Sequence, residues 1–339
     1  MADQGDGSGG AVPRMSRRAY LDSLSIVSGR HDPRALTLYA VMRDEAFLLP
    51  AFLAHYRGIG VRQFLVLDDG SADGTAELLA AQGDVVLLRS PYGFGETIAL
   101  RRPLLPARRR RAGIAFKELA PDRFLRGRWA LYADADEFLL LPPGVRDVAE
   151  VIARLAAEGA PSCAASVVEA FPAGLDGLAP HPPAADLAGL LARYPLIEPH
   201  PVLRLRRGRQ AALAGPSKTL MLYERHGVPG AASSARNKTP LVRHAWPTRR
   251  RGSHKTNRAP SRRVMLTMLH FVFTAEFRAK VERARLRRAH VGGAANYDRY
   301  GALLGAMEAA GEGFAAPTSV PFAGPAQLME AGLMRWPGA

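Results

Sequence analysis

The chain has 339 residues, of which 47% are hydrophobic, so it can bury a sizeable core in one large α/β domain or two modest ones. Its single cysteine, Cys163, excludes an intramolecular disulfide and fits a reducing compartment. The polar, glycine-rich start lacks the apolar run of a signal peptide, and no apolar stretch reaches the roughly 20 residues that a bilayer span needs. We therefore expect a cytoplasmic protein.

The charge is strongly positive, with 46 Lys and Arg against 31 Asp and Glu, a formal net charge of +15. Most of the excess is arginine in four clusters, within 101–111, 204–209, 249–263 and 283–288. Such clusters favour an anionic partner: nucleic acid, an anionic membrane surface at the inner membrane face, or an acidic substrate. An arginine-rich composition that simply places Arg on solvated faces explains any one cluster at least as well.

The expected elements alternate between strands and helices over the first half of the chain. Residues 1–34 are expected to form a flexible arm that includes a short helix. The strands then expected from short apolar runs are 35–42, 64–67, 85–88, 129–133 and 164–168. The helices expected between them are 47–56, a segment from 74 onward, and 145–158. This alternation predicts an α/β fold with a mostly parallel central sheet flanked by helices, whose ligands bind beyond the carboxyl ends of the strands.

The second half is less regular. Residues 171–200 are rich in Pro, Ala and Gly and predict a mobile loop. An apolar run at 264–273 precedes a basic amphipathic helix at 275–289 and another helix at 298–310, and the Gly/Pro-rich end is expected to be loosely packed. The expected organisation is an arm at 1–34, a catalytic domain at 35–290, and a C-terminal helix and tail at 291–339.

Two carboxylates follow the apolar strand at 129–133. In an extended segment residues i and i+2 face the same side, so Asp134 and Asp136 are expected to project together. Two carboxylates on one side suit a hard divalent ion, Mn²⁺ or Mg²⁺, which keeps open positions for substrate phosphates. The plain alternative is a solvated acidic turn, which any Asp-x-Asp can form.

A second acidic strand end is the segment DDGSADGT at 68–75. Its paired carboxylates can accept hydrogen bonds from a base or a ribose, and the helix N-terminus that follows favours an anion nearby. For this local sequence alone, an ordinary strand-to-helix turn with good capping is the better interpretation.

Three segments together resemble the family 2 glycosyltransferases: YAVMRDE at 39–45, LVLDDGSADGT at 65–75 and LYADADEF at 131–138. HYRGIG at 55–60, with His270-Phe271 and the later Phe277-Arg-Ala-Lys280, resembles one subgroup more narrowly. The resemblance covers roughly residues 35 to 288. It implies a GT-A fold, a UDP- or GDP-type sugar donor, a glycan or other hydroxyl acceptor as in polysaccharide biosynthesis, and usually inversion at the anomeric carbon.

The resemblance also implies roles for residues on the donor side. Asp68 or Asp69 would hold the nucleotide, with Arg43 and Glu45 at its border. Asp134 and Asp136 would lie by the diphosphate.

Further implied roles concern the metal and the contacts around it. Asp136 is the more direct ligand of the Mn²⁺ or Mg²⁺ ion that Asp134 would share. His270 would complete the metal site or touch a phosphate, with a core histidine as an equal alternative. Lys218 and His244 would contact phosphate or acceptor.

Inversion needs a carboxylate that takes the acceptor proton. Glu169, just past the fifth expected strand, is the first candidate and Asp176 the second, against the plainer interpretation of a surface Glu. The segment VEAFPAG at 168–174 departs from the polar, glycine-rich segment of many relatives, so it leaves the acceptor open.

The sequence thus predicts a metal-dependent, inverting glycosyltransferase, in which Glu169 and Asp136 carry catalysis. The alternative is a non-catalytic basic protein that binds nucleic acid or an anionic membrane or glycan surface. Aromatic residues make up only 7% of the chain and do not interleave with the basic runs, which argues against specific nucleic-acid binding.

Overall fold

The computed structural model describes residues 12–102, 104–207, 210–229, 236–287 and 295–338. Its helices are α1 (Arg17–Asp22), α2 (Leu49–Gly58), α3 (Thr75–Ala80), α4 (Ala112–Phe124), α5 (Val148–Ala157), the 3₁₀ helix η1 (Leu175–Leu178), α6 (Leu187–Arg193), α7 (Lys218–Arg225), α8 (Phe277–Arg287), α9 (Ala295–Ala310) and α10 (Pro325–Glu330). Its strands are β1 (Arg14–Met15), β2 (Ser25–Ser28), β3 (Thr37–Met42), β4 (Gln63–Asp68), β5 (Val85–Arg89), β6 (Thr97–Arg102), β7 (Leu105–Arg111), β8 (Trp129–Tyr132), β9 (Glu137–Leu140), β10 (Ser162–Phe171), β11 (Leu196–Ile197), β12 (Leu203–Arg207), β13 (Gln210–Ala214), β14 (Asn237–Arg243), β15 (Met265–His270) and β16 (Val320–Pro321). Within this described part of the chain, no helix is long and apolar enough to cross a membrane.

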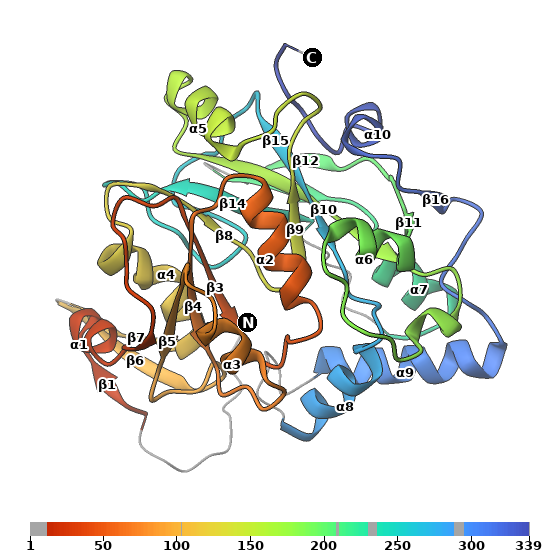
Figure 1. Cartoon of the computed structure of the whole chain (residues 1–339), viewed down its shortest axis with the longest axis horizontal. Helices are drawn as coiled ribbons and strands as arrows, with labels where there is room; N and C mark the ends of the chain where they lie inside the picture. Colours follow the sequence, from red (N-terminus) through yellow and green to blue (C-terminus); the bar gives the residue numbers. More distant parts are fainter. Residues whose placement is uncertain (1–11, 103, 208–209, 230–235, 288–294, 339) are drawn as a thin grey trace.

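A mixed sheet of eleven strands forms the centre of the α/β fold (Figure 1). Its main path runs β16-β11-β10-β14-β8-β3-β4-β5-β2, and β15 pairs with both β10 and β9. The strands β5, β4, β3 and β8 are parallel neighbours, as the alternating pattern predicts. Beyond β8 the pairing changes, because β14 runs antiparallel to both β8 and β10. The sheet is therefore mixed: parallel pairing joins its central strands, and one further parallel pair, β10 with β15, lies beyond β14.

Both faces of the parallel strands are buried. On β4, Phe64 and Val66 face one hydrophobic cluster, whereas Leu65 and Leu67 face another. The first cluster contains the apolar side chains of α2 and α5, and the second those of α4 and α1. Continuous apolar runs on these strands follow from this double cover, since neither face meets water.

Residues 12–34 are not the expected flexible arm. Part of that arm, residues 1–11, lies outside the described residues. The remainder forms β1, α1 and β2, and β2 pairs antiparallel with β5 as the edge of the main sheet. Tyr20 and Leu24 are buried, and the Tyr20 hydroxyl donates to the carbonyl of Ala112 at 2.7 Å. Apolar burial therefore anchors this segment.

Two other segments pack more tightly than the sequence suggests. Within 171–200, the expected mobile loop, Leu190 and Tyr194 are completely buried and α6 packs against α2. In the Gly/Pro-rich end, Leu328 and Leu333 join the main core. The isolated apolar residues in these Pro- and Gly-rich stretches carry the packing, although they form no periodic pattern.

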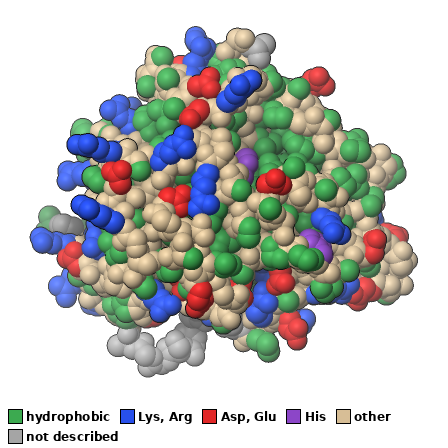
Figure 2. All heavy atoms as spheres, viewed as in Figure 1, with side chains coloured by type: hydrophobic (Ala, Val, Ile, Leu, Met, Phe, Trp, Pro, Cys, Tyr) green, Lys and Arg blue, Asp and Glu red, His purple; other side chains and the backbone are tan. Residues whose placement is uncertain are grey.

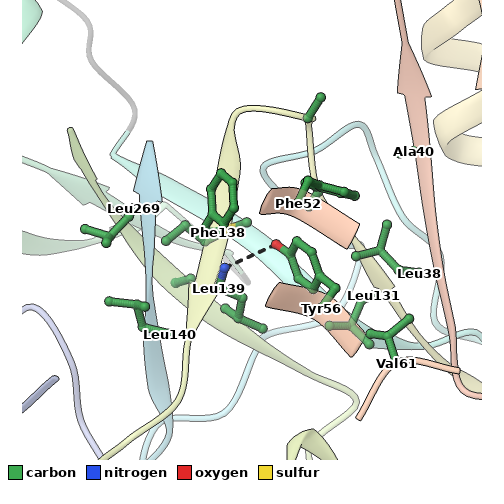
Figure 3. Packing of buried hydrophobic residues seen from close by; sticks show 14 of the residues in the cluster. Leu38, Ala40, Phe52, Tyr56, Val61, Leu131, Phe138, Leu139, Leu140 and Leu269 are labelled. Atoms are coloured by element: carbon green, nitrogen blue, oxygen red, sulfur yellow. Dashed lines mark hydrogen bonds between the residues drawn. The ribbon is translucent and has the colours of Figure 1, made fainter. Parts of the chain in front are cut away.

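One buried tyrosine of α2 fixes the backbone that follows β8 (Figure 3). The Tyr56 hydroxyl donates to the carbonyl of Glu137 at 2.9 Å and accepts from the N–H of Leu139 at 3.1 Å. Its ring packs among Phe52 and Phe138 in the core. The start of β9 is therefore tied to α2 through one hydroxyl, and the acidic turn before β9 is held in place with it.

We predict that Tyr56→Phe destabilises the protein by about 1–3 kcal/mol, because it leaves two buried backbone groups without their partner. Chemical denaturation monitored by circular dichroism measures the change. Tyr92→Phe, at a partly buried tyrosine outside this network, serves as the control and should change stability by at most about 0.5 kcal/mol. Equal stability of the two variants would contradict the role assigned to the Tyr56 hydroxyl.

Candidate functional site

A cavity of about 510 Å³ lies at the carboxyl ends of the central parallel strands. Its lining includes Arg43 to Glu45 after β3, Asp69 after β4, and Asp134 to Glu137 after β8. The structure therefore brings together the three segments on which the sequence analysis relies. Parallel strands end at the same edge of a sheet, which is why residues about 90 positions apart meet here.

The two aspartates after β4 have different surroundings. Asp69 lines the cavity, accepts from the N–H of Phe94 at 2.6 Å and lies 3.4 Å from Nη1 of Arg43. Burial raises the pKa of Asp69. Asp68 is buried and accepts from the N–H groups of Gly70 and Ser71, at 3.3 and 3.2 Å. Of the pair, Asp69 can contact a ligand, whereas Asp68 shapes the turn.

Asp134 faces the cavity, but its carboxylate is already engaged. Oδ1 accepts from Nζ of Lys117 at 3.0 Å and from the hydroxyl of Tyr132 at 2.5 Å, and Oδ2 accepts from Nζ of Lys238 at 2.8 Å. Burial alone would raise the pKa of Asp134, but Lys117 and Lys238 outweigh it and hold that pKa well below its usual value. Asp134 is therefore a fixed anion within a cage of protein donors.

Asp136 has looser contacts. Its Oδ2 lies 3.5 Å from Nε2 of His270 and 3.5 Å from Nζ of Lys280, which also donates to Glu45 at 2.9 Å. Burial alone would lower the pKa of His270, but the Asp136 charge outweighs it and raises that pKa to about 9. Burial raises the pKa of Glu45 to about 7 despite Lys280. The Asp136 side is thus a cluster of paired charges.

The extended arrangement expected for 134–136 does not occur. β8 ends at Tyr132, and residues 135–136 form a turn in which the N–H of Glu137 donates to the carbonyl of Asp134 at 3.0 Å. The rule that i and i+2 share a side holds only for extended backbone. Both aspartates line the cavity, but a turn and not an extended strand sets their positions, which corrects the geometric reason given for a shared ion.

Asp136 and His270 could nevertheless hold a divalent cation in part. Both side chains line the cavity and are partly exposed, at 19% and 25%. Within the described ranges, no group of three or more His, Cys, Asp or Glu side chains is arranged to hold a metal ion. An ion there would need phosphate oxygens and water for most of its ligands, as Mg²⁺ commonly does, and would displace the proton of His270.

Glu169 lies on the opposite side of His270 from Glu137. In the register of β10 and β15, Glu169 pairs with His270, which pairs with Glu137 on β9. Glu169 lines the cavity, and its two oxygens accept from the N–H and the hydroxyl of Thr219, at 2.8 and 2.6 Å. Its carboxylate is therefore fixed at the start of α7. Asp176, the second candidate base, lies in η1 and does not line the cavity.

Lys218 and His244 do not lie in the cavity. Lys218 is buried, donates to Glu198 at 2.7 Å, and its ammonium lies 4.5 Å from the centre of the Phe171 ring. His244 follows β14, at the end of β8 away from the acidic turn, and burial lowers its pKa to about 3. The structure therefore corrects both expectations: each side chain is part of the packed interior.

Two of the three lysines that surround the acidic turn, Lys117 and Lys238, were missed from the sequence, and Lys280 was noted only as part of a motif, with no role assigned. The chain contains only five lysines, at 117, 218, 238, 255 and 280, among its 46 basic residues. Lys117, Lys238 and Lys280 all line the cavity. An ammonium is a compact charge with three rotatable donors, so one lysine can bridge two carboxylates, as Lys238 does between Asp134 and Glu137. The scarcity of lysine was thus a usable signal.

Comparisons with known proteins add little to this geometry. Neither a family model nor a curated protein matches the chain. Among solved structures, the UTP-bound UGPase from Acinetobacter baumannii is 10% identical, with a TM-score of 0.28, over 88% of this chain and 92% of that one. The UDP-glucose pyrophosphorylase of that organism is likewise 10% identical, with a TM-score of 0.27, over 80% and 99%. Similarity at this level carries no argument about function.

We predict that Lys238→Met destabilises the fold by about 3–5 kcal/mol, because it leaves Asp134 and Glu137 buried without their shared cation. The pKa of both carboxyls should then rise in the folded state. The loss should therefore shrink as the pH is lowered and the carboxylates take up protons. Denaturant titrations of wild type and variant at several pH values between 5 and 8 measure this difference in the free energy of unfolding.

The matched control is Lys255→Met, at an exposed lysine, which should change stability by at most about 0.5 kcal/mol throughout this pH range. A Lys238→Met deficit that stays constant across this pH range would count against buried charge as its cause.

Proposed function

We propose that this protein is a glycosyltransferase of the GT-A type that transfers a sugar, with inversion, from a nucleotide-diphosphate donor to a hydroxyl acceptor. The observation that carries the proposal is the convergence of Asp69, Asp136 and three lysines in one cavity. A volume of about 510 Å³ is in the usual range for small-molecule sites. Mixed acidic and basic lining suits a ligand with a polar nucleoside at one end and charged phosphates beyond it.

The nucleoside end is assigned to the carboxyl edge of β3 and β4. Asp69 can accept from a base N–H or a ribose hydroxyl, and Arg43 fixes its orientation. Phe94 lines the same part of the cavity and supplies an aromatic ring there. A UDP- or GDP-type donor fits this set because uracil and guanine both carry a ring N–H that can donate a hydrogen bond to a carboxylate.

The diphosphate end is assigned to Lys280, His270 and Asp136. Departure of a nucleoside diphosphate builds negative charge, and fixed cations stabilise that charge more in the transition state than in the ground state. Lys280 and the protonated His270 are such cations, held in place by Glu45 and Asp136. A divalent ion bound by Asp136 and His270 would supply the same stabilisation more strongly.

Glu169 is proposed as the base that takes the acceptor proton. A carboxylate has about four lone-pair sites, and Thr219 uses two of those of Glu169. The remaining sites can accept from an acceptor hydroxyl, while Thr219 keeps the carboxylate in one orientation. Because Glu169 is on β10 and Asp69 follows β4, four strands away along the sheet, the acceptor side lies opposite the nucleoside side.

The function is tested by incubating the full chain with a panel of nucleotide sugars and measuring thermal stabilisation and release of nucleoside diphosphate. We expect at least one UDP- or GDP-sugar to raise the melting temperature saturably and to be hydrolysed slowly by water. No response to any nucleotide sugar, with or without Mn²⁺, would favour a non-catalytic binding protein.

We predict that Asp136→Asn lowers the transfer rate by on the order of 10² or more, because the substitution removes the charge that holds Lys280, His270 and any bound ion. EDTA should abolish wild-type transfer, and Mn²⁺ or Mg²⁺ should restore it. The measurement is steady-state product formation at saturating donor. Full activity in EDTA would remove the metal from the proposal but leave the lysine and histidine cations in it.

We predict that Glu169→Gln lowers transfer about 10²-fold while donor binding stays unchanged, since glutamine can accept from the Thr219 N–H and donate to its hydroxyl but cannot take a proton. Hydrolysis of the donor by water should fall less than transfer does. Asp176→Asn is the matched control, because that carboxylate does not line the cavity, and it should transfer normally. A Glu169→Gln variant with normal transfer would exclude Glu169 as the base.

A further inference from the structure

A basic hairpin with an exposed apolar tip projects from the side of the molecule. Strands β6 and β7, together with β1, form a separate three-stranded sheet (Figure 1). At the turn between them, the side chain of Leu104 is completely exposed, with a relative accessibility of 103%, and that of Leu105 is 54% exposed. Two adjacent leucines in water at the end of a projection are costly, because no neighbour shields them.

Arginines surround this tip on both strands. Arg101, Arg102 and Arg109 are exposed, and Arg108 and Arg110 lie 3.4 and 3.7 Å from Glu118 of α4. The carboxylate of Glu118 thus offsets only part of the charge of these guanidinium groups, so the hairpin keeps a net positive charge. Figure 2 shows blue side chains gathered along the edge of the molecule where Figure 1 places β6, β7 and α1.

We propose that this hairpin docks the protein on an anionic lipid bilayer. The leucines would insert into the boundary between headgroups and acyl chains, and the arginines would contact phosphate groups of anionic lipids. Charge complementarity argues for an anionic surface, and the leucine tip selects a bilayer over nucleic acid. A phosphate backbone would engage the arginines, but it offers no apolar region to an aliphatic tip, and the hairpin carries no aromatic side chain on which bases could stack.

The position of the hairpin relative to the cavity adds a consequence. Phe94, three residues before β6, and Lys117, six residues after β7, both line the cavity. Leu104 is ten residues after Phe94, and an extended chain of that length spans at most about 35 Å. A protein docked through Leu104 and Leu105 would therefore hold its cavity within about that distance of the bilayer. This docking does not depend on the chemistry proposed for the cavity.

The test is co-sedimentation of the full chain with vesicles of phosphatidylcholine alone or of phosphatidylcholine and phosphatidylglycerol in equal parts. We expect binding to the anionic vesicles, weakened by added salt, and at least tenfold weaker binding to the neutral ones. Leu104→Ser/Leu105→Ser should lower the affinity for anionic vesicles at least tenfold, as should Arg101→Gln/Arg102→Gln/Arg109→Gln. All five side chains are exposed, so their replacement should not disturb folding, which circular dichroism checks.

The matched control is Leu286→Ser, which removes a leucine that is 81% exposed on the basic helix α8 and should bind vesicles like the wild type. Unchanged vesicle binding by the Leu104→Ser/Leu105→Ser variant would overturn the proposal, and so would equal binding of the wild type to neutral and anionic vesicles. Absence of vesicle binding, with tight binding to duplex DNA that the arginine variant loses, would assign the hairpin to nucleic acid instead.

Discussion

The cavity depends on neutralising three carboxylates within four consecutive residues, Asp134, Asp136 and Glu137. Two like charges about 4 Å apart repel each other by about 4 kcal/mol at the effective dielectric constant near a protein surface. Lys238 lies between two of them, 2.8 Å from Asp134 and 2.6 Å from Glu137, and Lys117 adds a second cation to Asp134. These ammonium groups offset the repulsion among the carboxylates of the buried turn after β8.

The parallel centre of the sheet and the acidic strand ends could be predicted from the sequence, because both depend on local signals. Apolar runs of eight, four and four residues mark β3, β4 and β5, and ligand binding at the carboxyl ends of parallel strands then places Asp69 near Asp134. The partners of Asp134 could not be predicted in the same way. Lys238 reaches it because β14 runs antiparallel beside β8, and nothing in the local sequence of β14 specifies that neighbour.

The sequence did not reveal the hairpin of β6 and β7, and it led to wrong expectations for the two chain termini, for a related reason. In β7, Arg108 and Arg110 share a face that contacts Glu118. The strand therefore lacks the alternation of apolar and polar residues from which a strand is predicted. At the other end of the chain, Leu333 packs into the core from a segment rich in Gly and Pro. The C-terminal segment is ordered by partners that are distant in sequence, whereas β7 is ordered by its neighbour β6 and by Glu118. In neither segment does the composition reveal these partners.

The two halves of the chain contribute unequally to the proposed reaction. The parallel strands supply the donor side through Asp69 and Asp136, whereas helices after residue 210 supply Lys280 and Tyr297 to the cavity and fix Glu169 through Thr219. Those helices pack on one another in a separate apolar cluster that includes Phe273. Because Lys280 of α8 is assigned to the diphosphate of the donor, substitutions on the cavity side of α8 should change donor binding although the strands stay in place. Within this proposal, the sheet places the nucleoside and the carboxylates, including Glu169 on β10, and the helical cluster adds a cation at the diphosphate end.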